Sequence, residues 1–258
     1  MKPLYCALAS ALLLAACTPG ADDKAKPTAQ ASATAVSAPT ALILRAGDGL
    51  TVFARRYDAK KPKALILLFH QAGSSKDEYA TIAPRLATAG YSSLAVDARV
   101  GGKLFGVNET AAVMETKDYI EAQKDMQAAL TWAESQNLPI ILWGSSYSAS
   151  LVFPLAKVNP DKVGAILAFS PGEYFDDKQL IQQAAAAAAV PVFITSASTA
   201  DEIAAAGKIA AAVPGGHAQQ YIPKIGVHGS STLIAAKDPK GAEDNWRAVM
   251  AFLKKVAP

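Results

Sequence analysis

One strand–turn–helix pattern near the middle of the chain constrains its fold more than any other feature. Residues 138–143 (LPIILW) form a short continuous apolar run, which is typical of a β-strand buried on both faces. The run leads into residues 144–148 (GSSYS), and a helix-like pattern follows. In this context a G-x-S-x-G motif has a physical meaning, because a tight turn after a strand exposes the serine Oγ above a sheet. The last position is Ser148 instead of Gly, so the match has one departure.

Strand-like and helix-like segments alternate after residue 41. The segments 41–45 and 50–57 flank a Gly-Asp-Gly turn and predict an opening hairpin. The other expected strands are 64–69, 91–96, 140–143, 163–169, 191–195 and 219–222, and the expected helices are 76–89, 115–136, 181–189, 201–213 and 246–256. This order predicts an α/β fold in one domain over residues 41–258. We expect a doubly wound, mostly parallel sheet with helices on both faces.

The first forty residues have a different composition. An apolar run over residues 4–16 has the length of a signal peptide and is too short to span a bilayer. It ends in LAAC at 14–17, which resembles a bacterial lipobox, and residues 17–40 carry almost no large apolar side chains. We therefore expect a signal peptide over 1–16, a lipidated Cys17 and a flexible tether over 17–40. An ordinary secretory signal cut near Ala16 is the alternative.

The lipobox also predicts a location. Lipidation of Cys17 would anchor the chain in the bacterial cell envelope through its lipid only. The residue after the cysteine is Thr18 and not Asp, which by resemblance to such lipoproteins favours the outer membrane, with the domain facing the periplasm.

Charge and cysteine content exclude several kinds of site. The only cysteines are Cys6 and Cys17, so the expected domain has no disulfide and no cysteine-based metal site. Three histidines without spaced carboxylates predict no zinc site. The net charge of +3 comes without a basic block, which gives no support for nucleic-acid binding. No glycine-rich nucleotide motif follows a strand, so we expect no cofactor.

Polar residues follow four of the expected strands, at the edge where doubly wound sheets bind their ligands. These segments are 70–75 (HQAGSS), the turn around Ser146, 196–202 (SASTADE) and 225–233 (IGVHGSSTL). Serine, acid and then histidine is the chain order of one known triad arrangement. A serine hydroxyl is a poor nucleophile alone, so Ser146 needs a base within hydrogen-bond reach. His228 is the candidate base, because imidazole titrates near neutral pH.

Taken together, these segments resemble the α/β-hydrolases, and in particular their small dienelactone-hydrolase-like branch. The resemblance covers about residues 60–257 and depends on HQAGSS at 70–75, DAR at 97–99, GSSYS at 144–148 and HGSSTL at 228–233. That branch often uses a cysteine nucleophile, where this chain has Ser146. Many relatives insert a cap between the segments that end at Phe169 and begin at Pro191. Only about twenty residues separate them here, so we expect no large cap domain and an open site.

The resemblance implies roles for the site residues. Ser146 would be the nucleophile and His228 the base, and Asp201 would orient the imidazole. Glu202 and Glu173 remain open as alternative acids, because Glu202 is adjacent to Asp201 and Glu173 follows the preceding strand.

Backbone amides would complete the site. The N–H groups of Tyr147 and Ala72 would form the oxyanion hole. His70 is expected to shape its loop and His217 to lie in a surface loop. The implied function is hydrolysis of a small-molecule carboxylic ester through an acyl-enzyme. A thioesterase or perhydrolase with the same triad, or a tethered binding lipoprotein without catalysis, are the alternatives.

Overall fold

The computed structural model describes residues 37–258. The expected signal peptide, Cys17 and the tether up to residue 36 lie outside the described residues. Residues 37–39 have no regular structure, and the first strand begins at Thr40, at the expected end of the tether.

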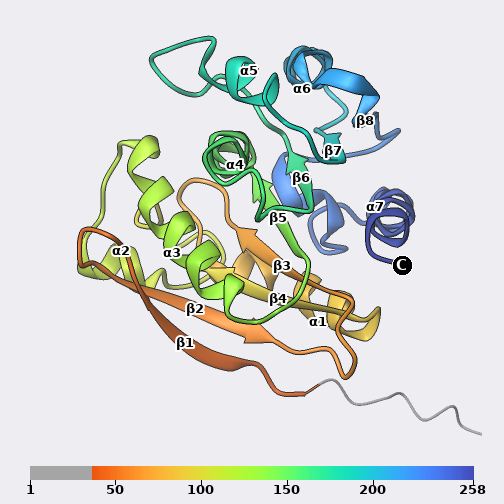
Figure 1. Cartoon of the computed structure of the whole chain (residues 1–258). Helices are drawn as coiled ribbons and strands as arrows, with labels where there is room; N and C mark the ends of the chain where they lie inside the picture. Colours follow the sequence, from red (N-terminus) through yellow and green to blue (C-terminus); the bar gives the residue numbers. More distant parts are fainter. Residues whose placement is uncertain (1–36) are drawn as a thin grey trace, which may run out of the picture. The chain divides into compact units, whose positions relative to one another are not determined.

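An eight-stranded sheet organises the domain (Figure 1). Its strands are β1 (Thr40–Arg45), β2 (Thr51–Tyr57), β3 (Ala64–Phe69), β4 (Tyr91–Val96), β5 (Ile140–Ser145), β6 (Ala165–Phe169), β7 (Val192–Thr195) and β8 (Ala218–Tyr221). They lie in the order β1-β2-β4-β3-β5-β6-β7-β8. The pairs β1–β2 and β2–β4 are antiparallel, and every other pair is parallel. The predicted hairpin and mostly parallel α/β sheet are confirmed.

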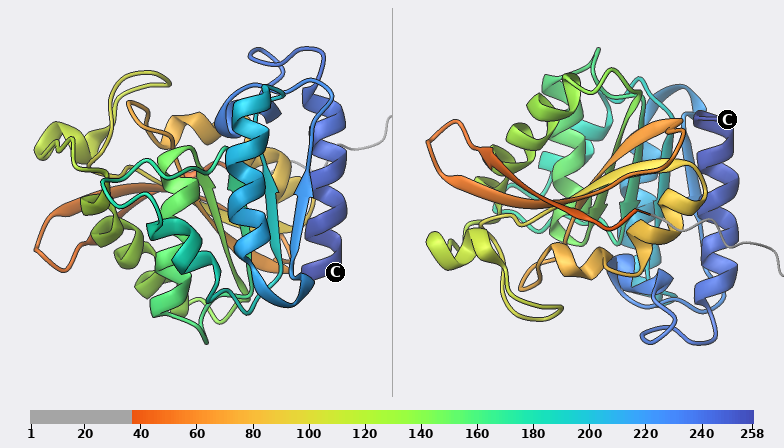
Figure 2. Two further views of the ribbon diagram at one scale, coloured as in Figure 1. Left: turned by 90° about the horizontal axis from the view of Figure 1, so that it is seen from above. Right: turned by 90° about the horizontal axis from the view of Figure 1, so that it is seen from below.

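Helices cover both faces of the sheet, as the views of Figures 1 and 2 show. One face carries α1 (Ile82–Thr88) and α7 (Ala242–Val256), and the other carries α3 (Gln123–Glu134), α4 (Tyr147–Val158), α5 (Leu180–Ala185) and α6 (Ala200–Ala212). Successive strand residues face opposite sides, so Leu65 and Leu67 of β3 enter one apolar core and Ile66 and Leu68 the other. This double burial explains the continuous apolar runs in the central strands.

The helices differ from their predicted ranges. The segment 76–89 divides into a 3₁₀ helix, η1 (Lys76–Tyr79), and α1. The segment 115–136 becomes helical only at η2 (Tyr119–Ala122), where the Asp118 carboxylate accepts the Ile120 N–H, and continues as α3. A short helix, α2 (Glu109–Val113), follows β4 and was not expected. Within residues 37–258 no helix combines the length and the apolar character that a membrane crossing requires.

The loops that follow the parallel strands meet at one edge of the sheet, and buried ion pairs hold them. The Lys76 ammonium lies 2.7 Å from Asp97, directly after β4, and 2.6 Å from Glu109 at the start of α2. The Asp97 carboxylate also accepts the backbone N–H groups of Lys76 and Glu109. Between β6 and β7 the chain contains only α5 and its connecting loops, so the expectation of no large cap domain is confirmed. These contacts connect the loop after β3 with the loop after β4 at this edge of the sheet.

Candidate active site

The turn after β5 holds Ser146 in a strained conformation. Its φ of 61° and ψ of −123° lie in a region that residues with a side chain rarely occupy. Gly144 makes the turn possible, because a Cβ atom there would lie 2.4 Å from the carbonyl oxygen of Ser148 and 2.5 Å from the Cα of Ala149. Ser146 is the only residue between 141 and 150 that is not buried. The turn therefore presents a single hydroxyl at the C-terminal edge of the sheet.

Ser148, the departure from the motif, takes part in the same turn. Its buried hydroxyl accepts the N–H of Ser145 at 2.9 Å and donates to the carbonyl oxygen of Phe69 at the end of β3, 2.8 Å away. The side chain thus occupies the space next to the turn with two satisfied hydrogen bonds, and the small-residue requirement is met without glycine.

His228 lies between the serine and a carboxylate. Its Nε2 is 2.8 Å from the Ser146 Oγ, and its Nδ1 is 2.9 Å from an Oε1 of Glu202. His228 directly precedes the 3₁₀ helix η4 (Gly229–Leu233) after β8, and Glu202 lies in the first turn of α6 after β7. Three segments that are far apart in the sequence therefore form one continuous hydrogen-bonded chain.

The carboxylate that contacts His228 is Glu202, and the expected contact from Asp201 is not found. Adjacent helix residues project about 100° apart, so only one of the two can face the imidazole. Asp201 is exposed, and a hydrogen bond with the Thr199 side chain is the main cause that lowers its pKa. Glu173, the third candidate, accepts the N–H groups at the start of α5, from Ile181 at 3.0 Å and from the next residue at 2.8 Å. It caps that helix and does not contact the histidine.

Electrostatics favour a charged Glu202 and a basic His228. Burial alone would raise the pKa of Glu202, but hydrogen bonds from His228, Ser170 and the Ala197 N–H outweigh it and hold the pKa at about 2. The hydrogen bond to Glu202 raises the pKa of His228, burial opposes it, and the charges of Glu202 and Glu78 add to the rise. A carboxylate acceptor at Nδ1 keeps a proton there, which leaves the Nε2 lone pair to face Ser146.

The remaining histidines have structural or surface positions. His70 is fully buried, with Nδ1 2.7 Å from the carbonyl oxygen of Gln71 and Nε2 accepting the Ala98 N–H at 3.0 Å. Burial lowers its pKa, so it links two loops as a neutral ring. His217 is exposed just before β8, at the opposite end of the strand from His228.

The two expected oxyanion amides follow neighbouring strands of the sheet, β5 and β3. Tyr147 is the first residue of α4, and a helix leaves its first N–H groups without partners inside the helix. Ala72 lies in the loop after β3, whose last residue pairs with Gly144 in the sheet register. Their role toward a substrate oxygen stays a prediction.

A cavity of about 500 Å³ lies near the nucleophile turn, although none of Ser146, His228 and Glu202 lines it. Its wall is aromatic at Tyr119, Tyr174 and Phe175, and the Tyr119 ring lies 4.9 Å from the ring of Tyr147. Burial first, and then the charge of Glu202, raise the pKa of Tyr174 to about 12, while its contact with the Ser146 hydroxyl opposes the rise. The charged residues on the wall are Lys117, Asp118, Asp176 and Asp177. Tyr174 joins the cavity to Ser146, so a substrate group that extends past Tyr174 would meet aromatic faces and an excess of carboxylates.

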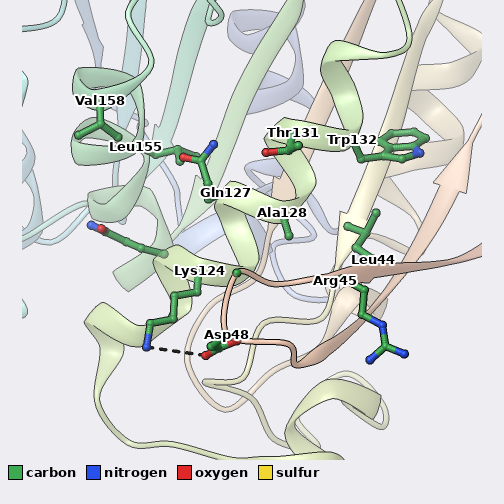
Figure 3. A pocket seen from close by; sticks show the side chains of 12 residues that line it. Leu44, Arg45, Asp48, Lys124, Gln127, Ala128, Thr131, Trp132, Leu155 and Val158 are labelled. Carbon is green, nitrogen blue, oxygen red and sulfur yellow. Dashed lines mark ion pairs between the residues drawn. The ribbon is translucent and has the colours of Figure 1, made fainter.

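A second cavity, of about 800 Å³, lies elsewhere (Figure 3). It is a groove between the β1–β2 turn, α3 and the C-terminal part of α4, with Trp132 and Leu155 on its wall and an ion pair between Asp48 and Lys124 at one end. Leu155 is nine residues beyond Ser146, roughly 13 Å along α4. This groove is thus separate from the Ser–His–Glu chain. Within residues 37–258 no three His, Cys, Asp or Glu side chains are grouped to hold a metal ion.

The sheet order and the strained serine turn define the α/β-hydrolase class. A family model described as "Serine aminopeptidase, S33" (Hydrolase_4) matches residues 60–211, and the chain belongs to this family. The prediction that the chain is a hydrolase is therefore confirmed at the level of the family. No curated relative matches the sequence.

Solved structures share the fold at low sequence identity. A dienelactone hydrolase from Anabaena variabilis is 16% identical with a TM-score of 0.68, and the match covers 86% of this chain and 99% of that one. An esterase from Pyrococcus furiosus is 17% identical with a TM-score of 0.65, covering 86% and 93%. A thermostable carboxyl esterase from Bacillus coagulans is 11% identical with a TM-score of 0.65, covering 86% and 100%. At these identities the likeness shows the fold, which is that of the α/β-hydrolases.

Proposed function

We propose that this protein hydrolyses carboxylic esters through a Ser146–His228–Glu202 triad and an acyl-enzyme intermediate. The observation that carries the proposal is the unbroken chain of 2.8 Å and 2.9 Å contacts from the strained serine through the imidazole to a carboxylate with a pKa of about 2. Such a chain activates a hydroxyl that is otherwise unreactive at neutral pH.

The reaction follows from the geometry. His228 takes the Ser146 proton on Nε2 as Oγ bonds to the ester carbonyl carbon, and the carbonyl oxygen gains the negative charge. The N–H groups of Tyr147 and Ala72 bind that oxyanion, and the imidazolium returns its proton to the leaving alcohol. Water then attacks the acyl-enzyme with the same base, and Ser146 regains its proton. Glu202 stays ionised and stabilises the imidazolium in both halves.

The cavity near Ser146 supports esters that carry no negative charge. Aromatic faces attract apolar groups and cations, and three aspartates against one lysine repel a carboxylate. The same carboxylates favour a second candidate, hydrolysis of an aminoacyl bond, in a substrate whose ammonium group extends into this cavity. The description of the family as a serine aminopeptidase agrees with this candidate.

A labelling and substrate experiment tests the proposal. A fluorophosphonate probe should label the wild-type chain and fail to label Ser146→Ala, while the matched control His217→Ala should be labelled like the wild type. A panel of p-nitrophenyl esters of increasing chain length, an aminoacyl ester, an aminoacyl p-nitroanilide and a thioester then separates esterase, aminopeptidase and thioesterase. Labelling that persists in Ser146→Ala would reject this nucleophile, and a chain that binds these compounds without turnover would support the binding lipoprotein.

We further propose that Cys17 anchors the enzyme to the bacterial cell envelope through lipid, at the outer membrane facing the periplasm. The lipobox-like LAAC at 14–17 supports this location. Metabolic labelling with an alkyne fatty acid should mark the wild type and not Cys17→Ser, and membrane fractionation should release the variant. Equal labelling of both chains would contradict the anchor.

A further inference from the structure

A second carboxyl group lies behind the candidate active site and has no place in the mechanism above. Glu78 belongs to η1, within the charged sequence Lys76-Asp77-Glu78-Tyr79, and its exposed fraction is 1%. Its neighbours in η1 have other partners, since Lys76 pairs with Asp97 and Asp77 pairs with Arg55. A buried carboxyl group without a cation beside it is costly, so its hydrogen bonds need an explanation.

Both oxygens of Glu78 are bonded to the catalytic loops. One accepts the backbone N–H of Gln71 at 2.8 Å, directly before Ala72 in the expected oxyanion loop. The other accepts the hydroxyl of Ser145 at 2.7 Å, directly before Ser146. The Ser145 Oγ in turn accepts the N–H of Ser230 at 2.8 Å, in the loop that carries His228. One carboxyl group thereby connects the oxyanion loop, the nucleophile turn and the histidine loop.

The fit around this connection is tight. Gly229 has a φ of 67°, and a Cβ atom there would lie 2.5 Å from the Ser145 Oγ. The loop can therefore approach Ser145 only with glycine next to His228. The Ser230 hydroxyl is fixed on its other side by the indole N–H of Trp143, 2.9 Å away. Ser145 and its partners are held on every side by buried groups.

Glu78 is also electrostatically coupled to the base. Burial raises the pKa of Glu78 to about 7, while the hydrogen bonds from Gln71 and Ser145 oppose the rise. The charged group that faces Glu78 from the loop after β8 is His228. The negative charge of Glu78 raises the pKa of His228. Burial raises the pKa values of Tyr79 in η1 and Tyr147 in α4, and the charge of Glu78 adds to both rises.

We propose that Glu78 is a positioning residue of this active site. Its carboxyl group fixes the oxyanion loop and the nucleophile turn against the histidine loop, and its negative charge favours the imidazolium that forms during catalysis. The inference rests on the proposed ester hydrolysis. It makes Glu78 a support that acts through Gln71, Ser145 and His228 and does not touch the substrate.

Two variants separate the two parts of this role. Glu78→Gln removes the ionisable group and one hydrogen-bond acceptor, whereas Ser145→Ala keeps the ionisable carboxyl group and cuts the connection to the histidine loop. Asp77→Asn is the matched control, because it neutralises the adjacent carboxylate, which faces Arg55. For each full-length variant, kcat and KM for a p-nitrophenyl ester are measured from pH 5 to 9, together with the thermal unfolding midpoint.

The expected results differ between the variants. Glu78→Gln should reduce kcat about 10- to 100-fold with KM changed by less than about threefold, because misplaced catalytic groups slow the chemical step more than binding. Its acidic limb of kcat/KM should also move to lower pH, by about half a unit, because the His228 pKa loses the support of a nearby anion. Ser145→Ala should reduce kcat with a smaller displacement of the acidic limb, because the carboxyl group remains and only loses one hydrogen bond that favours its ionised form. Asp77→Asn should remain within about twofold of the wild type.

Other outcomes overturn the inference. A Glu78→Gln variant with wild-type kcat, or with a reduced kcat and an unmoved acidic limb, would show that the residue is inert or only structural. If Glu78→Gln does not fold, Ser145→Ala decides, and an unchanged kcat there refutes the positioning role. A wild type that neither hydrolyses esters nor reacts with fluorophosphonate refutes the proposed function itself, and the inference with it. An active wild type with an equally active Glu78→Gln refutes the inference alone.

Discussion

Glu202→Gln is expected to reduce kcat for ester hydrolysis by about 10³-fold, and Asp201→Asn to leave it nearly unchanged. The two residues are adjacent in the first turn of α6, and only Glu202 contacts His228. The glutamine amide has the size of the carboxylate without its charge. The amide can also donate a hydrogen bond to Nδ1, which would place the imidazole proton on Nε2. A protonated Nε2 cannot accept the proton of Ser146.

The magnitude follows from the contact distance. Unit charges at the 2.9 Å that separates Nδ1 from the carboxylate oxygen interact by about 5–6 kcal/mol at an effective dielectric constant of about 20. The side chains of His228 and Glu202 are 40% and 24% exposed, so water screens part of this energy and we take about 4 kcal/mol. At about 1.4 kcal/mol for each factor of ten, the loss corresponds to about 10³-fold in kcat.

Steady-state hydrolysis of p-nitrophenyl acetate measures this difference, with circular dichroism to verify that both variants are folded. The comparison is internally matched, because each substitution neutralises one carboxylate in the same helical turn. A loss below about tenfold for Glu202→Gln, or a larger loss for Asp201→Asn than for Glu202→Gln, would refute the assignment of the acid.

Three further predictions follow from other parts of the structure. The base His228 must be neutral to accept a proton, and its pKa is raised, so kcat/KM should fall on acidification with a midpoint above the ordinary histidine value of about 6.5. A midpoint below that value in a pH-rate profile would contradict this geometry. Lys76→Met should lower the free energy of unfolding, measured in urea, by about 3–5 kcal/mol, because it leaves the Asp97 carboxylate buried without its cation. A loss under about 1 kcal/mol would be inconsistent with a buried ion pair. Gly144→Ala should abolish fluorophosphonate labelling and lower the free energy of unfolding by about 1–3 kcal/mol, because its Cβ would overlap the backbone of α4. A stable variant that is still labelled would show that the turn can relax.

The fold and two members of the candidate triad could be predicted because their signals are local. The apolar runs of β3 and β5 are buried on both faces by two helix layers. Their continuous apolar sequence is therefore enough to predict that these strands lie in the centre of the sheet. Ser146 could be predicted because the turn around it needs glycine and small residues, and the backbone contacts that require them lie within five positions of Gly144. His228 follows from the convergence of parallel strand ends at one edge.

The acid and the supporting carboxyl group depend on geometry that no short segment encodes. Whether Asp201 or Glu202 faces the histidine is set by the rotation of α6 about its axis, which its packing against α5, β7 and β8 determines. Glu78 follows Lys76 and Asp77 at the start of the expected helix 76–89, and such a charged sequence indicates a solvated helix end. It is buried by loops from residues 71, 145 and 230, and sequence spacing does not reveal such a meeting.

The hydroxyl of Ser148 has a consequence for finding other proteins of this kind. A search that requires glycine at the fifth position of the motif would discard this chain, although the serine there cross-links two neighbouring strands of the sheet. In this chain, a second serine two positions after the nucleophile takes the place of the glycine and makes hydrogen bonds to both strands. Chains with the G-x-S-x-S spelling after an apolar strand are therefore worth testing as hydrolases.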